Sequence, residues 1–283
     1  MECNPDDITP DYAQVIGELP ISRVSMGAQT FSDERLRFLR RRHTSSQVKE
    51  AVELLRRNGI QNISIDLMFG FPSETLKDWE QDIHDALALD VEHLSAYSLM
   101  IEEGTVLYEQ MREKRSEMGD EDVEREMYET LIDRLETAGY EHYEISNFAK
   151  KGFRSRHNSS YWNGTPYIGL GAAAHSYDIE TRHWNMADLS AYIERIRQGI
   201  LPIEETETID DTTRYNDLIT TALRTREGIN LTTLPHSFRD YLLENAQKNI
   251  VRHLLEITDN HLHLTRQGLF VSDDVMSDLI LLD

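Results

Sequence analysis

Four short apolar runs in this chain each finish at a polar or acidic residue, and helix-forming sequence separates them. The runs finish at Glu2, Gln29, Asp66 and Ser98, which are 27, 37 and 32 residues apart along the chain. This alternation predicts an α/β fold in which helices join parallel strands and the carboxyl ends of the strands meet at one edge. Because such folds hold their ligands at that edge, the same pattern also predicts a binding site.

The chain divides into three predicted parts. Residues 1–110 form strand–helix repeats of a partial (β/α) barrel that lacks its first strands. Residues 111–209 complete the barrel as an α+β segment, with a strand at 139–146 and an aperiodic Gly- and aromatic-rich stretch at 152–177. Residues 210–283 resemble a winged-helix domain. Helices are expected there at 212–224, 238–255 and 265–282, with a hairpin at 257–264.

Composition excludes several classes of function. The formal net charge of −22 argues against nucleic acid or acidic membranes as partners, since both require a basic surface. Residues 210–283 hold twelve Asp or Glu against seven Lys or Arg, so the winged-helix-like part is expected to pack against protein instead of DNA. No apolar run reaches the ~18 residues of a membrane helix. A single cysteine, Cys3, excludes an internal disulfide and favours a cytoplasmic location.

The polar residues at the strand ends are suited to a zwitterionic, nucleoside-like ligand. Glu2, Gln29 and Asp66 follow strands, and Arg41 lies on the helix after the second strand. Carboxylates and a carboxamide can hold ribose hydroxyls or an amino group, and a guanidinium can clamp a carboxylate through two hydrogen bonds. Spacing alone leaves the alternative that these side chains cap loops or pair with neighbouring residues.

The words around these residues resemble the oxygen-independent coproporphyrinogen III oxidase family of radical S-adenosylmethionine proteins. The words are Glu-Cys-Asn-Pro-Asp-Asp (2–7), Arg-Val-Ser-Met-Gly-Ala-Gln-Thr-Phe (23–31), Arg41-Arg42-His43 and Ile-Asp-Leu-Met-Phe-Gly-Phe-Pro (65–72). The match is in register from Glu2 to about Ser98 and looser beyond. This resemblance implies that Glu2, Gln29, Arg41 and Asp66 contact S-adenosylmethionine, and it places Met100 at a further cofactor position.

The resemblance also implies a 4Fe-4S cluster, which the family holds in a CxxxCxxC loop on an earlier strand. That loop is absent from this sequence, and Cys3 stands in the Glu-Cys-Asn-Pro word, where it is not a cluster ligand. We therefore expect the chain alone to be inactive in forming a 5′-deoxyadenosyl radical. We also expect it to be the C-terminal portion of a longer protein, with the cluster cysteines upstream of Met1. The sheet edge left exposed predicts dimerisation.

A second motif, His157-Asn158-Ser159-Ser160-Tyr161-Trp162, precedes Tyr167-Ile168-Gly169-Leu170-Gly171 and His175-Ser176. Histidine can ligate haem iron, and Trp and Tyr can stack on a porphyrin. Residue types alone leave the alternative of a polar loop whose aromatic side chains plug the barrel mouth. The motif is similar to the haem-chaperone (HemW-like) branch of the family, which binds haem and passes it to acceptor proteins. That resemblance implies a haem site at His157, Asn158, Tyr161 and Trp162, with His157 as the iron ligand, and places His175 near the cofactor or substrate.

The leading function that the resemblance implies is therefore a haem chaperone, with haem and an acceptor protein as partners. Two alternatives stay open. One is the oxidase branch, which decarboxylates coproporphyrinogen III to protoporphyrinogen IX, and the other is a non-catalytic binding module. The sequence does not decide whether the chain belongs to an enzyme.

Overall fold

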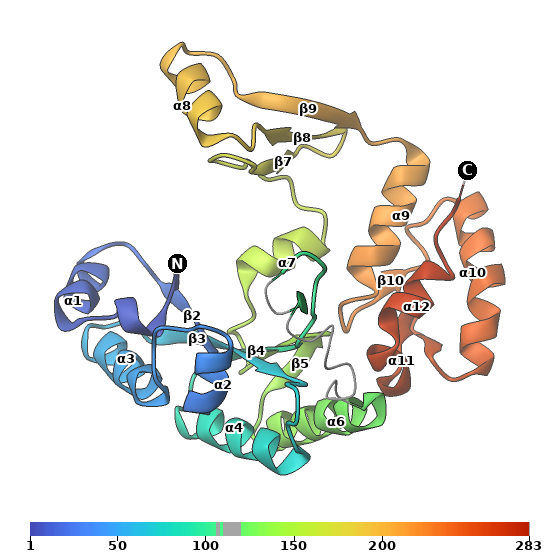
Figure 1. Cartoon of the computed structure of the whole chain (residues 1–283). Coiled ribbons are helices and arrows are strands. Elements are labelled where there is room, and N and C mark those ends of the chain that lie inside the picture. Colours follow the sequence, from blue (N-terminus) through green and yellow to red (C-terminus); the bar gives the residue numbers. More distant parts are fainter. Residues whose placement is uncertain (106–107, 110–119, 283) are drawn as a thin grey trace. The chain divides into compact units, whose positions relative to one another are not determined.

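The computed structural model describes residues 1–105, 108–109 and 120–282 (Figure 1). The chain divides into two compact units, Met1–Arg154 and Ser155–Asp283, which are considered separately. The predicted boundary between residues 110 and 111 lies outside the described residues, so the three-part division of the chain remains a prediction.

The first unit is built on a six-stranded mixed sheet in the order β1-β2-β3-β4-β6-β5. Four parallel strands, β1 to β4, are joined by helices, which confirms the α/β fold expected from the spacing of the polar strand ends. The strands are β1 (Glu2–Cys3), β2 (Arg23–Gln29), β3 (Asn62–Phe69), β4 (His93–Ser98), β5 (Glu141–Glu144) and β6 (Asn147–Ala149). The helices are η1 (Pro5–Asp7), α1 (Pro10–Glu18), α2 (Asp33–Phe38), α3 (Ser45–Arg57), α4 (Leu76–Ala88) and α6 (Glu121–Thr137).

The strand predicted at 139–146 is present as β5, which is shorter than expected and is followed by a second strand, β6, so that the two form a hairpin. β5 ends at Glu144, the chain turns through Ile145 and Ser146, and β6 returns antiparallel to both β5 and β4. The turn is held by the buried Glu144 carboxylate, which accepts hydrogen bonds from the Ser146 backbone N–H (3.0 Å) and the Asn147 side chain. The sheet therefore changes from parallel to antiparallel after β4.

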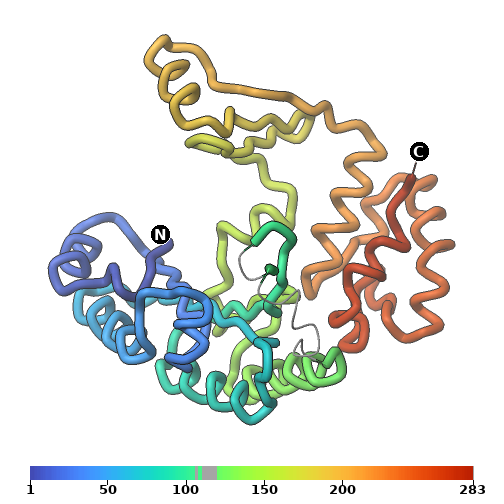
Figure 2. Tube along the Cα trace, viewed as in Figure 1, coloured from blue at the N-terminus to red at the C-terminus, as the bar shows by residue number. Residues whose placement is uncertain are grey.

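The two faces of this sheet differ in polarity because successive side chains along a strand point to opposite faces. One face is apolar and is covered by the helices, which lie together along one side of the strands in Figure 2. The buried apolar residues on it include Val24, Met26, Ile63, Ile65, Leu94 and Phe148. The other face, which we call the lumenal face, carries Ser25, Ser64, Asp66, His93, Ser95 and Asn147, aligned across neighbouring strands.

The second unit contains two three-stranded antiparallel sheets, with strand orders β7-β8-β9 and β10-β12-β11. Its strands are β7 (His175–Tyr177), β8 (Thr181–Asn185), β9 (Ile203–Thr208), β10 (Ile229–Asn230), β11 (Leu255–Thr258) and β12 (His261–Leu264). Its helices are α7 (Arg156–Trp162), α8 (Leu189–Arg197), α9 (Asp211–Ala222), α10 (His236–Val251), α11 (Arg266–Phe270) and α12 (Ser272–Ser277). The hairpin expected at 257–264 is present as β11 and β12.

One prediction for this unit is wrong. The single final helix expected at 265–282 is broken at Val271, which leaves helical geometry (φ −110°, ψ 28°) and separates α11 from α12. The break lets α12 bury Val275 and Met276. The stretch 152–177, expected to be aperiodic, contains α7, whose start is capped by the Ser155 hydroxyl.

Helix α8 contains no buried residue. Leu189, Ile193 and Ile196 are spaced to form one apolar stripe, yet they are 62%, 39% and 50% exposed. Within the described part of the chain, no helix is both long enough and apolar enough to span a membrane.

Candidate functional site

Gln29 ends β2 in a left-handed conformation (φ 65°) and is buried. Its side chain lies against Gly27, since a Cβ placed on Gly27 would be 2.6 Å from Gln29 Nε2 and 3.8 Å from Arg41 Nη1. Glycine at position 27 therefore leaves the space in which the Gln29 carboxamide and the Arg41 guanidinium lie close together.

The acidic motif at residues 2–7, which follows β1, contacts the basic motif Arg41-Arg42-His43, which follows α2. Arg41 Nη1 donates to Asn4 Oδ1 (3.3 Å), and Arg42 forms an ion pair with Asp6 (3.0 Å). Both motifs can be recognised in the sequence, but the contact between them cannot be predicted from it. Arg41, expected on the helix after the second strand, instead lies in the loop beyond the end of α2, beside Gln29.

Asp66 lies half-buried on the lumenal face of β3, next to Ser95 of β4. The pKa of Asp66 is raised to about 6, chiefly by burial and also by the nearby Glu2 carboxylate, while the neighbouring Ser95 and Ser25 hydroxyls and Arg23 lower it. Glu2 itself is exposed. Glu2, Gln29 and Asp66 thus lie on the neighbouring strands β1, β2 and β3, with Asp66 inside its strand and not at the strand end that the sequence predicts, and Arg41 lies beside Gln29. Met100, in the loop after β4, is 78% exposed.

The lumenal face also holds a buried polar row that the sequence analysis missed. His93 lies between Ser64 Oγ (2.8 Å from Nδ1) and the Tyr143 hydroxyl (2.7 Å from Nε2), and its burial lowers its pKa to about 3. Ser95 donates to Asn147 Oδ1 (3.0 Å). The signal in the sequence was a histidine within an otherwise apolar run. Its hydrogen-bond partners lie 29 and 50 residues away along the chain, so the sequence alone did not identify them.

The described residues do not fit an iron–sulfur cluster. They contain no group of three or more His, Cys, Asp or Glu side chains placed to hold a metal ion. Cys3 is half-buried on β1, and burial raises the pKa of its thiol, which disfavours the thiolate that ligates iron.

The second motif forms α7, and the helix divides it between two faces. His157 and Tyr161, four residues apart, share one face, where the Tyr161 hydroxyl lies 3.2 Å from His157 Nε2. Asn158 and Trp162 share another. The Arg224 guanidinium lies 5.1 Å from the Trp162 ring centroid, and no described residue accepts a hydrogen bond from the buried Trp162 Nε1.

The face of α7 that carries His157 continues onto the β7-β8-β9 sheet as a row of rings. Tyr161 contacts Tyr167 with centroids 4.9 Å apart, and Tyr167 pairs with Tyr177 across an antiparallel bridge. His175 and Tyr177 project from the same face of β7, two residues apart, and His175 stacks on Trp184 of β8 at 5.5 Å. We call this row the aromatic face: His157, Tyr161, Tyr167, Tyr177, His175 and Trp184.

Comparison with known proteins identifies the family. Residues 1–86 match the model of the Radical SAM superfamily, and residues 209–271 match the HemN C-terminal domain. The "Heme chaperone HemW" of Bacillus subtilis is 35% identical over 97% of this chain and 74% of its own length. The protein of the same name from Lactococcus lactis is 30% identical over 100% of this chain and 75% of its own.

The solved structure of Escherichia coli coproporphyrinogen III oxidase (HemN), described as a radical SAM enzyme, has the same fold. Its TM-score is 0.82 at 17% identity, over 99% of this chain and 68% of that one. Fold and matched models together define a radical-SAM-type barrel followed by a HemN-type C-terminal domain. The chain belongs to the HemN-like radical S-adenosylmethionine family of haem chaperones, as its sequence motifs predict. Membership implies S-adenosylmethionine and an iron–sulfur cluster as the cofactors of the family.

Proposed function

We propose that this chain binds haem on the aromatic face of its second unit, as part of a haem chaperone. The observation that supports this most directly is the row of rings that begins at His157 and runs through Tyr161, Tyr167 and Tyr177. A porphyrin is a flat apolar disc, and stacked or edge-on aromatic rings are the protein surface that packs best against it.

His157 is the proposed axial ligand. It is exposed, and its Nε2 faces the Tyr161 hydroxyl, a neutral partner that water or a bound ligand can replace without leaving a buried charge. His175, on the same row, offers a second imidazole. Asn158 and Trp162, on the other face of α7, are proposed to position the helix, with Trp162 packed under Arg224.

Haem titration tests this proposal. We expect the His157→Ala variant to lose affinity for haem and to shift the Soret band, because the iron loses its nitrogen ligand. The matched control is His84→Ala, which removes an exposed histidine from α4 in the first unit. An unchanged affinity and Soret spectrum in His157→Ala would remove His157 as the ligand.

The fold alone does not separate a chaperone from an oxidase, because this chain has the fold of a solved oxidase structure while its relatives in sequence are named haem chaperones. Incubation of the full-length protein with coproporphyrinogen III, S-adenosylmethionine and a reductant separates them. We expect stable haem binding without turnover, whereas protoporphyrinogen IX formed at a catalytic rate would favour the oxidase. Transfer of the haem to an acceptor protein, in the cytoplasm, completes the proposed role.

We further propose that Glu2, Gln29, Arg41 and Asp66 hold S-adenosylmethionine, with Met100 as a further contact. The placement of the Gln29 carboxamide and the Arg41 guanidinium beside each other at Gly27 supports this proposal. Arg41 is suited to the methionyl carboxylate, and the carboxylates of Glu2 and Asp66 are suited to the amino group and the ribose hydroxyls. In this family, S-adenosylmethionine bound to a reduced cluster is the source of a 5′-deoxyadenosyl radical. The residues described here do not fit that cluster, and no radical step is assigned to them.

Equilibrium dialysis with S-adenosylmethionine tests this second site without any turnover. Because the pKa of Asp66 is raised to about 6, its carboxylate is ionised at pH 8 and largely protonated at pH 5. We therefore expect affinity to fall as the pH falls through about 6, and the Asp66→Asn variant to bind weakly at both pH values. Glu53→Gln, an exposed neutralisation on α3, is the control. Equal affinity of Asp66→Asn and the parent chain at pH 8 would exclude Asp66 from the site.

A further inference from the structure

A cleft of about 440 Å³ opens between α2 and α4 in the first unit, on the helix-covered side of the sheet. Three aromatic rings, Phe31, Phe38 and Phe71, form part of its wall. Four carboxylates also line it: Glu34, Asp78, Asp82 and Asp85. None of these residues belongs to the two proposed ligand sites.

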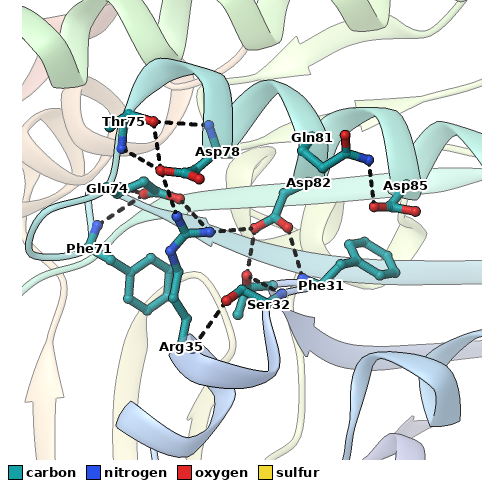
Figure 3. A network of polar contacts seen from close by, with 12 residues as sticks. Phe31, Ser32, Arg35, Phe71, Glu74, Thr75, Asp78, Gln81, Asp82 and Asp85 are labelled. Atoms are coloured by element: carbon teal, nitrogen blue, oxygen red, sulfur yellow. Dashed lines mark hydrogen bonds and ion pairs between the residues drawn. The ribbon is translucent and has the colours of Figure 1, made fainter.

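Arg35 lies in the wall of this cleft, held by carboxylates from α4 and the loop before it (Figure 3). Its guanidinium lies 3.3 Å from Asp78, 3.4 Å from Glu74 and 3.7 Å from Asp82. The Asp82 carboxylate is fixed in turn by the Phe31 N–H (3.0 Å). The acidic wall is therefore a rigid part of the fold.

The charges around the cleft do not balance. Glu34, Asp78, Asp82 and Asp85 line it, and Glu74, which pairs with Arg35, has its pKa raised to about 7 by burial and is therefore only partly ionised. The cations that act on these carboxylates are Arg35, Lys77 near Asp78, and Lys49, which pairs with Asp85 (3.0 Å). The surplus is negative. Beneath the rim, the Glu74 side chain is fully buried, and no described residue donates a hydrogen bond to its Oε1.

The aromatic rings of the cleft already lie beside positive charges. Arg35 Cζ is 5.9 Å from the Phe71 ring centroid, and Lys49 Nζ is 5.9 Å from that of Phe31. Cations are attracted to ring faces at such distances, most strongly where water is excluded. A further cation entering the cleft would meet both the rings and the surplus carboxylates.

We propose that this cleft docks a basic, amphipathic segment of a partner protein, with an apolar side chain between the rings and Lys or Arg side chains on the carboxylates. The rim favours a peptide over a small amine, because Glu34 is exposed and the Asp78 side chain is 48% exposed, so negative charge extends beyond the cavity. Complementary charge of this kind steers and selects partners. The inference is independent of haem and S-adenosylmethionine binding.

The probe is a labelled peptide of alternating Lys and Leu with one central Phe, measured by fluorescence anisotropy at physiological salt. Glu34→Gln/Asp85→Asn removes two charges from the rim, and Glu50→Gln/Glu53→Gln removes two exposed charges from α3 as the matched control. We expect the rim variant to bind about fivefold to tenfold more weakly, and the control to stay within about twofold of the parent.

A third variant, Phe38→Ala, keeps the net charge and is expected to weaken binding as well, because it removes part of the aromatic wall. Three outcomes would overturn the proposal. They are equal weakening in the two double variants, which would indicate attraction to the net charge of −22 alone; no saturable binding to the parent chain; and displacement of the peptide by an equimolar free diamine.

Discussion

Replacing Asp82 with alanine is expected to destabilise the first unit strongly. The Asp82 carboxylate is 3% exposed and accepts hydrogen bonds from the Thr30 hydroxyl (2.6 Å) and the Phe31 N–H (3.0 Å). A hydrogen bond to a charged acceptor contributes about 1.5–3 kcal/mol, so two of them give about 3–6 kcal/mol. Burial raises the pKa of Asp82, which means that the ionised carboxylate pays for its desolvation. The expected loss is therefore at the lower end, about 3 kcal/mol.

The charge of Arg35 does not add to this loss, because Glu74 and Asp78 remain as its partners after the substitution. Asp85→Ala on the same helix is the control. It removes a partly exposed pair with Lys49, which contributes under about 1 kcal/mol. A large difference between the two variants would thus report the buried contacts of Asp82 and not a general effect of charge on α4.

Urea unfolding measures this difference in the first unit when it is followed by the fluorescence of the fully buried Trp79 in a Trp162→Phe/Trp184→Phe background, which removes the two tryptophans of the second unit. The free energy of unfolding is expected to fall by about 3 kcal/mol in Asp82→Ala with an unchanged denaturant slope. A loss below about 1 kcal/mol, equal to that of Asp85→Ala, would refute the reasoning, since it would show that the two donors find water at no cost.

Two further predictions concern other parts of the chain. Gly169→Ala would place a Cβ 2.1 Å from the His175 carbonyl oxygen, and should cost about 1–3 kcal/mol in thermal unfolding. Gly164→Ala, which has open space but a φ of +67°, should cost about 1 kcal/mol. The pKa of His93 is lowered to about 3, so the unfolded chain takes up a proton below its ordinary pKa of 6.5 while the folded chain does not. The contribution of the neutral His93 side chain to the free energy of unfolding is therefore complete above pH 6.5, and it is lost as the pH falls from 6.5 toward 3. His93→Gln should flatten that slope in urea unfolding, and an unchanged slope would contradict the assignment.

The parallel part of the sheet could be predicted from sequence because its signals are local. An apolar run that is followed by a helix start, as at 23–29 and 62–69, needs no distant partner to be recognised. The residues at neighbouring strand ends then lie near each other as a consequence of parallel pairing. This is why Glu2, Gln29 and Asp66 could be grouped from spacing, and why Arg41 required the resemblance of its surrounding word.

The errors arose where contacts distant in sequence decide the local structure. The return of the chain after Ile145–Ser146 depends on the pairing of β6 with β4, and the break at Val271 depends on what α12 buries. The division of the second motif between two helix faces could have been recognised. The i,i+4 spacing of His157 and Tyr161 is present in the sequence. With a helix predicted at 156–162, that spacing would have placed Trp162 on a different helix face from His157.

The absence of buried residues in α8 has a consequence for local unfolding. An isolated nine-residue helix is marginal in water, and the support for α8 comes from its ends, such as the Asp188 cap on the Ala191 N–H (2.7 Å). Its amides should therefore exchange with deuterium through small local openings, far faster than those of the buried α9 residues Tyr215 and Ile219. Burial of the apolar stripe of α8 against another surface would stabilise the helix. Slower hydrogen exchange of the α8 amides would therefore detect such burial.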